Sequence, residues 1–123
     1  MILVDTSVWI DHLRSGEEQL AQALLKTQVL VHPCVVGELA CGNLSNRVEV
    51  LELLQALPPA KQATDAEVMD FIESRRLMGR GIGYVDAHLC ASALISDALL
   101  WSRDKRLLSV AQDLGIAWLE PLH

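Results

Sequence analysis

The sequence has no apolar run long enough to cross a membrane and no recognisable export signal. Its longest apolar runs are interrupted by charge well before the roughly 20 residues that span a bilayer. The N-terminus, MILVDTSVW, has neither a basic region nor a cleavage site. Paired cysteines are also lacking, because Cys34, Cys41 and Cys90 are odd in number and form no CxxC pair. We therefore expect a cytoplasmic protein with buried thiols, rather than a disulfide framework or a zinc site.

A phosphate-binding loop is absent as well, although three glycines, Gly79, Gly81 and Gly83, occur at alternate positions. The sequence around them matches neither GxxxxGK(S/T) nor GxGxxG, and they follow a predicted helix rather than a strand. Glycines in this context favour a flexible connection between two helices.

An excess of positive charge is the third absence, since the net charge is −6, which argues against a nucleic-acid partner. The distribution of charge argues the other way. Between residues 75 and 106 only Asp86, Asp97 and Asp104 are acidic, and the net charge there is +3, whereas the rest of the chain carries −9. The six basic residues of this segment are Arg75, Arg76, Arg80, Arg103, Lys105 and Arg106. They form either a basic rim around an acidic centre or ordinary solvated helix faces.

The 123 residues suffice for one domain, and 51% of them are hydrophobic, which predicts a packed globular fold over residues 1–123. Short apolar runs alternate with longer stretches of helical period, as in an α/β domain with a mainly parallel sheet. The candidate strands are residues 1–4, 29–32, 98–101, 116–119 and, more weakly, 61–63. The candidate helices are residues 17–26, 33–44, 47–57, 64–77 and about 84–97.

Four acids from four separate segments are candidates for one site. Asp5 directly follows the first strand, and Glu38 lies about one and a half turns into the helix after the second strand. Asp86 falls in the first turn of the last long helix, and Asp104 lies in a loop three residues after the strand at 98–101. Ligands bind beyond the carboxyl ends of parallel strands, so these side chains are expected to converge at one sheet edge.

Each acid also has a purely structural interpretation. Asp5 could cap the next helix, Asp86 could be a helix-end acid, Asp104 a loop acid, and Glu38 an exposed helix position. The apolar neighbours of Glu38 and Asp86 nevertheless predict burial, which is costly for a lone carboxylate. A cation shared by several acids would account for all four together, and oxygen ligands suit Mg²⁺ or Mn²⁺.

The motifs that carry these acids resemble those of a known family. LVDTSVWIDHL, GELACG, YVDAHLCASAL and LLWSRDKRL occur in the order found in PIN-domain ribonucleases, specifically the VapC toxins of bacterial type II toxin–antitoxin pairs. The resemblance covers the whole chain. One departure is Ser102, where many relatives have threonine; the hydroxyl is retained, and its hydrogen bond can therefore survive.

The resemblance implies a three-layer α/β/α sandwich and a metal-dependent endoribonuclease that leaves a 5′-phosphate and a 3′-hydroxyl. Asp5, Asp86 and Asp104 would bind Mg²⁺ or Mn²⁺, Glu38 would complete the shell or orient the attacking water, and Ser7 would assist beside the metal. The implied substrate is a tRNA or rRNA loop. The implied partners are a VapB-type antitoxin and a second copy of the chain. The basic residues expected to contact RNA include Arg76, Arg80, Arg103 and Lys105.

Three other functions remain as alternatives. A receiver-like signalling domain has similar length and binds Mg²⁺, but it needs paired acids after the first strand and a lysine after the last, and neither occurs here. A haloacid-dehalogenase-type phosphatase would need an aspartate where Ser7 stands. A catalytically inactive PIN-like binding module would keep the fold, yet all four acids are present. The chemistry needs no histidine, so His12, His32, His88 and His123 are interpreted as structural or surface residues.

Overall fold

The computed structural model describes residues 1–121. At its centre lies a parallel sheet in the order β2-β1-β3, formed by β1 (Ile2–Val4), β2 (Val29–Leu30) and β3 (Leu99–Trp101). Ile2 pairs with Val29 on one side and with Leu99 on the other. All three residues of β1 are buried, as expected for a central parallel strand whose two faces are both covered.

Single bridges extend the sheet at both edges. Pro59 pairs with Val31, and Ala117 pairs with Leu100, both in parallel orientation. The parallel α/β class is thus confirmed, while the expectation of five strands holds only in part. The segments at the edges contribute one bridge each, and the weak strand predicted at 61–63 lies instead around Pro59. Proline has no N–H to donate, which limits how far this edge can extend.

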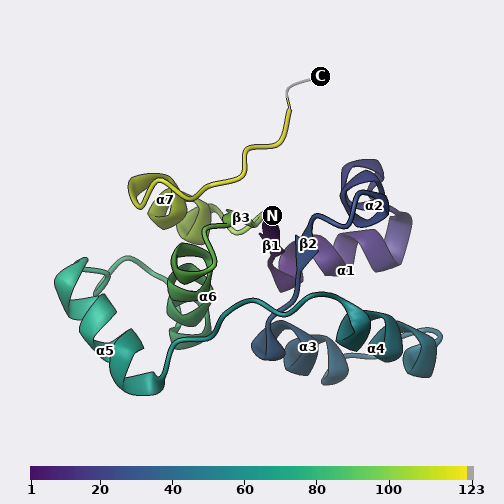
Figure 1. Cartoon of the computed structure of the whole chain (residues 1–123), viewed down its shortest axis with the longest axis horizontal. Helices are drawn as coiled ribbons and strands as arrows, with labels where there is room; N and C mark the ends of the chain where they lie inside the picture. The colour runs from purple at the N-terminus through teal and green to yellow at the C-terminus, as the bar shows by residue number, and fades with distance from the viewer. Residues whose placement is uncertain (122–123) are drawn as a thin grey trace.

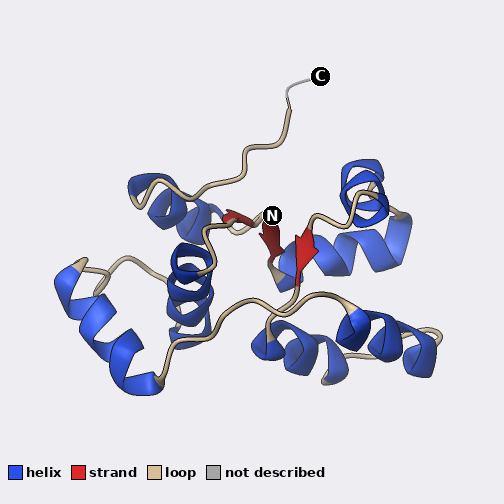
Figure 2. Cartoon of the chain, in the orientation of Figure 1, coloured by secondary structure: helices blue, strands red, loops and turns tan. Residues whose placement is uncertain are grey.

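Helices account for most of the described chain. They are α1 (Thr6–Ser15), α2 (Glu18–Leu25), α3 (Pro33–Ala40), α4 (Arg47–Ala56), α5 (Asp65–Ser74), α6 (Tyr84–Ile95) and α7 (Lys105–Asp113). In Figure 1 the strands lie between two groups of helices, with α5, α6 and α7 on one side and α1 to α4 on the other. Figure 2 shows how little of the chain is strand. Within residues 1–121, no helix is long and apolar enough to cross a membrane.

Five helices fall where the sequence predicted them, but each ends one to four residues earlier. Two helices were not among the predicted ranges. α1 follows Asp5 directly, and α7 begins one residue after Asp104. The sequence pattern of α7 is amphipathic, because Leu107, Val110 and Ala111 face the core while its other side is charged.

The core is built around β1 and α6. Trp9 and Trp101 are the largest fully buried side chains. α6 contacts both β1 and β3, and its buried residues are mostly small, which lets the helix lie close to the sheet. Cys90 is buried within α6, and burial together with the negative charges of Asp86 and Asp5 raises the pKa of its thiol to about 12. All three cysteines are free, but Cys41 is exposed, so the prediction of buried thiols holds only in part.

Candidate functional site

Asp5 is the most deeply buried of the four predicted site acids, with 6% of the residue exposed. Its Oδ2 atom accepts hydrogen bonds of 2.8 Å from the hydroxyls of both Ser7 and Ser102. Asp5 occupies the N-cap position of α1, but its side chain accepts no capping hydrogen bond. Its side-chain contacts therefore do not support the alternative that Asp5 is only a helix cap.

The two serines tie Asp5 to the segment between β3 and α7. Ser102 Oγ accepts the backbone N–H of Asp104 at 3.0 Å, and Ser7 Oγ accepts the backbone N–H of Arg103 at 3.1 Å. Each serine thus accepts one backbone hydrogen bond and donates its own to the same carboxylate oxygen. Ser102 and Asp5 are 97 positions apart in the sequence, so this contact fixes one end of the site across the fold.

Asp86 lies in the first turn of α6, as the sequence predicted, and it is half-buried. Its Oδ2 atom accepts the backbone N–H of Gly83 at 3.0 Å. Burial raises the pKa of Asp86, the hydrogen bond from Gly83 opposes this, and the negative charges of Asp5, Asp104 and Glu38 raise the pKa further. The four acids therefore share one electrostatic neighbourhood, which supports the predicted convergence.

Glu38 is exposed, so the burial predicted for it is wrong. The short helix α3 packs through Val35 and Leu39, and the side chain of Glu38 lies outside that packed stripe. Its Oε1 atom accepts a hydrogen bond of 2.8 Å from the hydroxyl of Thr6, the residue that follows Asp5. An apolar sequence context predicted burial all round the helix, whereas α3 packs against α1 and α4 and leaves one side exposed.

Asp104 is the N-cap of α7 rather than an ordinary loop acid. Its Oδ1 atom accepts the backbone N–H groups of Arg106 and Leu107 at 2.9 and 3.1 Å. This pair of bonds satisfies two of the free N–H groups at the start of a helix. The capping contact uses only one of the two carboxylate oxygens.

Within residues 1–121, no group of three or more His, Cys, Asp or Glu side chains is placed so that it could hold a metal ion. The donor chemistry nevertheless fits a hard cation. Asp5, Asp86 and Asp104 each bind the protein through one oxygen, and their other oxygens accept no hydrogen bond from residues 1–121. None of the four acids pairs with Lys, Arg or His in this part of the chain. Free carboxylate oxygens without a counter-charge are the ligands that Mg²⁺ and Mn²⁺ prefer.

Comparison with known proteins identifies the family of the whole chain. Residues 2–113 match the PIN domain family. The chain is also 46% identical over 121 residues to proteins named Ribonuclease VapC32 from Mycobacterium tuberculosis strains CDC 1551 / Oshkosh and H37Rv. The alignment covers 98% of this chain and 98% of those proteins. The chain belongs to the VapC family of PIN-domain proteins.

Two solved structures share the PIN fold. The crystal structure of FitAcB from Neisseria gonorrhoeae superposes with a TM-score of 0.61 at 23% identity, covering 91% of this chain and 94% of that chain. The structure of FitAB bound to an IR36 DNA fragment superposes with a TM-score of 0.64 at 20% identity, covering 100% of both chains. At these identities the likeness supports the fold alone.

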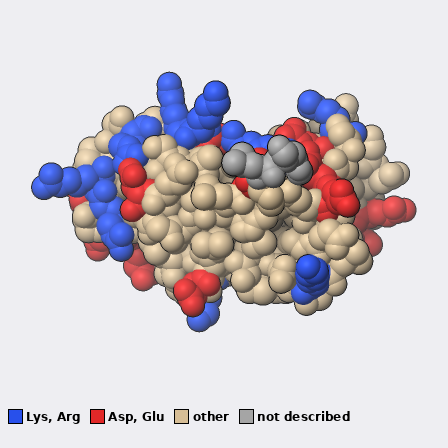
Figure 3. Space-filling view, turned by 90° about the horizontal axis from the view of Figure 1, so that it is seen from above, with Lys and Arg blue, Asp and Glu red and all other residues tan. Residues whose placement is uncertain are grey.

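The basic residues predicted to contact substrate differ in whether they are paired with acids. Arg80 pairs with Asp113 at 2.7 Å, and Arg103 is held by three acids. Arg76 and Lys105 are exposed and form no ion pair within residues 1–121. In Figure 3 most of the visible basic side chains lie on the side of α5 and α7. The basic rim therefore remains a prediction. The exposed cations support it, whereas Arg103, which is held by acids, does not.

Arg106 lies across the glycine-spaced loop before α6. A Cβ atom at Gly81 would come within 2.5 Å of the Arg106 side chain, and the φ angle of Gly81 is +81°. Glycine therefore meets two requirements here, a left-handed backbone and close approach of a side chain. The three glycines thus make a helix connection, as predicted, and one of them makes room for a cation beside the site.

A second polar network at the start of α6 was missed in the sequence. Tyr84 Oη donates to Asp65 Oδ1 at 2.7 Å, and His88 Nε2 lies 2.9 Å from the same oxygen. These hydrogen bonds, from Tyr84 first and then from His88, lower the pKa of Asp65. Tyr84 and His88 are four residues apart on α6, so they share one face and tie it to the beginning of α5. The four-residue spacing of Tyr84 and His88, on either side of Asp86, was the feature of the sequence that could have predicted this network.

The other histidines within the described residues also have structural contacts. His12 Nδ1 accepts the backbone N–H of Glu17, and His32 Nδ1 accepts the backbone N–H of Cys34 at the start of α3, each at 3.0 Å. Both contacts agree with the prediction of structural histidines. His123 lies outside the described residues.

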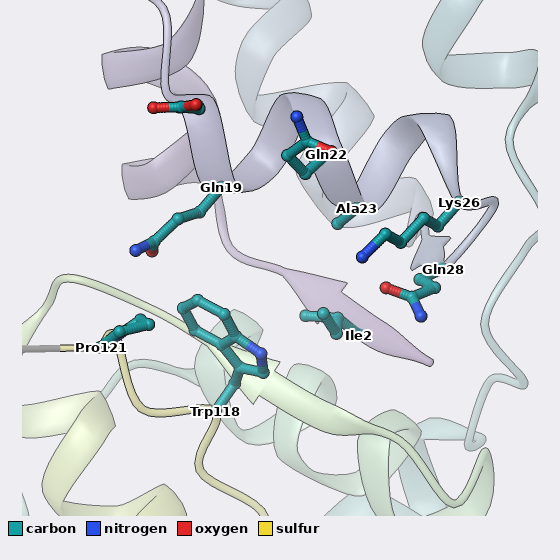
Figure 4. Close-up of a pocket in the computed structure, with 9 residues that line it drawn as sticks. Ile2, Gln19, Gln22, Ala23, Lys26, Gln28, Trp118 and Pro121 are labelled. Atoms are coloured by element: carbon teal, nitrogen blue, oxygen red, sulfur yellow. The ribbon is translucent and has the colours of Figure 1, made fainter.

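A shallow pocket of about 400 Å³ lies away from these acids, between α2 and the C-terminal segment. Figure 4 shows Trp118 facing Gln19 and Gln22 across it, with Ile2 beside Trp118 and Lys26 at one end. None of the four site acids lines it. We therefore assign the candidate active site to the acidic edge of the sheet and not to this pocket.

Proposed function

We propose that this PIN-domain protein is an endoribonuclease and acts as the toxin of a type II toxin–antitoxin pair. Its 46% identity over 98% of the chain to proteins named Ribonuclease VapC32 supports this activity. One structural observation supports a location for the active site. Asp5 is buried and oriented by two hydroxyls, and the charges of Asp5, Asp104 and Glu38 add to burial in raising the pKa of Asp86.

We propose Asp5, Asp86 and Asp104 as ligands of a divalent ion, Mg²⁺ or Mn²⁺. A bound divalent ion supplies a water of lowered pKa and offsets the charge that develops on the scissile phosphate. The hydroxyls of Ser7 and Ser102 orient Asp5, and the Gly83 N–H orients Asp86. These contacts leave one oxygen of each acid without a hydrogen bond from residues 1–121. Outer contacts of this kind fix the direction in which a ligand presents its free oxygen.

Glu38 has a separate proposed role. It is exposed and is held at the edge of the site by Thr6, rather than being enclosed with Asp5. From that position we propose that it completes the shell or orients the attacking water. Hydrolysis would then leave a 5′-phosphate and a 3′-hydroxyl.

The proposed substrate is RNA, in a single-stranded loop of a tRNA or rRNA, where bases are accessible. The exposed cations on the α5 and α7 side support phosphate binding there. These residues are Arg75, Arg76, Lys105 and Arg106. Phosphate contacts of this kind supply affinity and not sequence choice. The proposed location is the cytoplasm.

The proposed partners are a VapB-type antitoxin and a second copy of the chain. Exposed apolar side chains offer surface for them, since α1 exposes Ile10 and Leu13 and α4 exposes Val48 and Leu53. Co-expression with the neighbouring small open reading frame is expected to give a co-purifying complex with suppressed nuclease activity.

The test is RNA cleavage by wild type, Asp5→Asn, Asp86→Asn and Asp104→Asn, with and without Mn²⁺. Each substitution removes a negative ligand and keeps nearly the same shape, and asparagine still caps a helix at position 104. Cleavage is expected to fall by orders of magnitude in all three variants and on chelation in wild type. Metal-free Asp86→Asn is expected to melt no lower than wild type, because burial and repulsion disfavour its charge.

Sequencing of RNA ends after brief expression in cells would identify the substrate as discrete cuts. Wild-type cleavage that survives thorough chelation would contradict the metal site. An Asp86→Asn variant that cuts normally would contradict the role of that acid. A folded wild type without any RNA cleavage would favour the inactive binding module.

A further inference from the structure

Arg103 makes the most extensive ion-pair cluster among the described residues, and none of its partners is one of the four site acids. Its Nη1 atom lies 2.7 Å from Asp11 Oδ2 and 2.8 Å from Glu17 Oε1. Its Nη2 and Nε atoms donate to Glu120 Oε1 at 2.6 and 3.0 Å. The side chain is 26% exposed, so the guanidinium is largely enclosed by these partners. One side chain thereby joins α1, the start of α2 and the C-terminal segment.

The backbone of the same residue reaches the acidic site. The N–H of Arg103 donates to Ser7 Oγ, the preceding residue Ser102 donates to Asp5, and the following N–H of Asp104 donates to Ser102 Oγ. Three consecutive residues thus contact the site through their backbone and hydroxyl groups. The guanidinium between them points to a different set of partners.

We propose that Arg103 is a positioning residue that fixes Ser102 and Asp104 relative to Asp5, and that it does not contact RNA phosphate. This inference rests on the proposed ribonuclease function. The position of Arg103 in a basic segment predicted contact with RNA, and the proposed role differs from that prediction. Arg103 acts through the residues on either side of it and touches no reacting atom.

The charge around Arg103 opposes phosphate binding. Three carboxylates surround one guanidinium, which leaves an excess of negative charge. The adjoining pocket, of about 290 Å³, has three glutamates and a single cation among its lining residues, Glu17, Glu18, Gln19, Arg103, Glu120 and Pro121. A phosphate placed here would have to displace the acids from Arg103 and would be repelled by them.

Rigid geometry also favours a positioning role. A guanidinium presents several N–H groups in a fixed plane, so simultaneous bonds to three acids restrict its orientation more than a single ion pair does. A lysine at this position presents one compact charge and cannot reproduce the fork. The restricted side chain in turn restricts the backbone of residues 102–104, because they are joined covalently.

Kinetics on three altered proteins separate positioning from phosphate contact. Arg103→Gln removes the fork, Arg103→Lys keeps the charge, and Asp11→Ala/Glu17→Ala removes two partners while leaving the arginine. Positioning predicts that all three lower kcat with KM nearly unchanged, with Lys intermediate between wild type and Gln. The expected loss for Gln is at least about tenfold, since small misplacements around reacting atoms can cost about 10²-fold.

The salt dependence of RNA binding gives a second readout. Removing a true phosphate contact lowers the slope of log K against log salt by nearly one unit. We expect Arg103→Gln and Asp11→Ala/Glu17→Ala to keep the wild-type slope. Arg106→Gln, which alters an exposed cation of the same segment, is the comparison expected to lower it. Lys61→Gln is the control for loss of one exposed charge and should change neither kcat nor slope.

Hydrogen exchange of the Arg103 and Asp104 backbone amides tests positioning without RNA. Faster exchange in Arg103→Gln and in Asp11→Ala/Glu17→Ala, with wild-type exchange in Lys61→Gln, supports the inference even if no RNA is cut. Unchanged exchange in both altered proteins overturns it. A raised KM and lower salt slope in Arg103→Gln with kcat intact also overturns it. If Arg103→Gln does not fold, amide exchange in the Asp11→Ala/Glu17→Ala protein decides alone: faster exchange supports the inference and unchanged exchange overturns it.

Discussion

At the scale of single residues, the buried carboxylate of Asp5 relies on hydroxyl donors. A buried anion without compensation is costly, and Ser7 and Ser102 supply two hydrogen bonds to one of its oxygens. Ser102 is itself 5% exposed and also accepts the Asp104 N–H. The departure from threonine at this position therefore falls on a residue with two roles, holding Asp5 and holding the start of α7.

Substitution of Ser102 separates the hydroxyl from the rest of the side chain. Ser102→Ala leaves Asp5 with one hydroxyl donor and the Asp104 N–H without its acceptor, so we expect a loss of about 1–3 kcal/mol of stability and a lower kcat. Ser102→Thr retains the hydroxyl and should keep most activity. Thermal melts and RNA cleavage measure both effects. Ser15→Ala, an exposed serine on α1, is the control; equal melts and rates for Ser102→Ala and wild type would contradict the role.

At the scale of elements, α3 begins at a histidine that must remain neutral. His32 is 2% exposed, and its Nδ1 atom accepts the Cys34 N–H. Burial, and secondarily the nearby charge of His88, lower the pKa of His32. The unfolded chain therefore binds a proton at a higher pH than the folded chain does. The contribution of His32 to stability is complete above its ordinary pKa of 6.5 and is lost as the pH falls below it.

The corresponding measurement is the melting temperature between about pH 8 and about pH 5. Wild type is expected to lose stability on acidification over the lower part of this range. His32→Asn keeps a side chain that caps helices but removes the titrating ring, so its melting temperature should vary less with pH. The same pH dependence in both proteins would show that other groups are responsible.

Most elements could be predicted from local pattern, and the exceptions have physical causes. The strands at 1–4, 29–32 and 98–101 and five helices follow from apolar runs and helical period. α7 could also have been predicted, because an aspartate cap precedes Leu107, Val110 and Ala111 at helical spacing. The single bridges at the sheet edges could not be predicted from local pattern, since they depend on which distant segment lies beside Val31 and Leu100.

The four candidate acids could be selected from the sequence, but their contacts could not. The acids could be selected because each lies near the carboxyl end of a strand or the start of a helix. The prediction that Glu38 is buried was wrong, because an apolar helix of eight residues can still have one exposed side. The partners of Arg103 come from residues 11, 17 and 120, and no local pattern relates these positions.

At the scale of the whole molecule, charge separates the two sides of the sheet. Net charge is −6, yet exposed cations gather toward α5 and α7, as Figure 3 shows. The acidic cluster around Arg103 involves α1 and the residue before α2. Such a separation orients an approaching polyanion toward one side, and it does so more strongly at low salt.

Removing two cations from either side tests this orientation at equal net charge. We expect Arg75→Gln/Arg76→Asn to weaken RNA binding and to lower the salt slope, because both residues follow α5 on the basic side. Asparagine is chosen at position 76 because Arg76 has a φ of 54°, which asparagine tolerates. The matched protein, Arg14→Gln/Lys26→Gln, loses the same charge from α1 and the end of α2. Binding measured at several salt concentrations should fall less in this protein; equal losses in both would mean that net charge alone governs RNA binding.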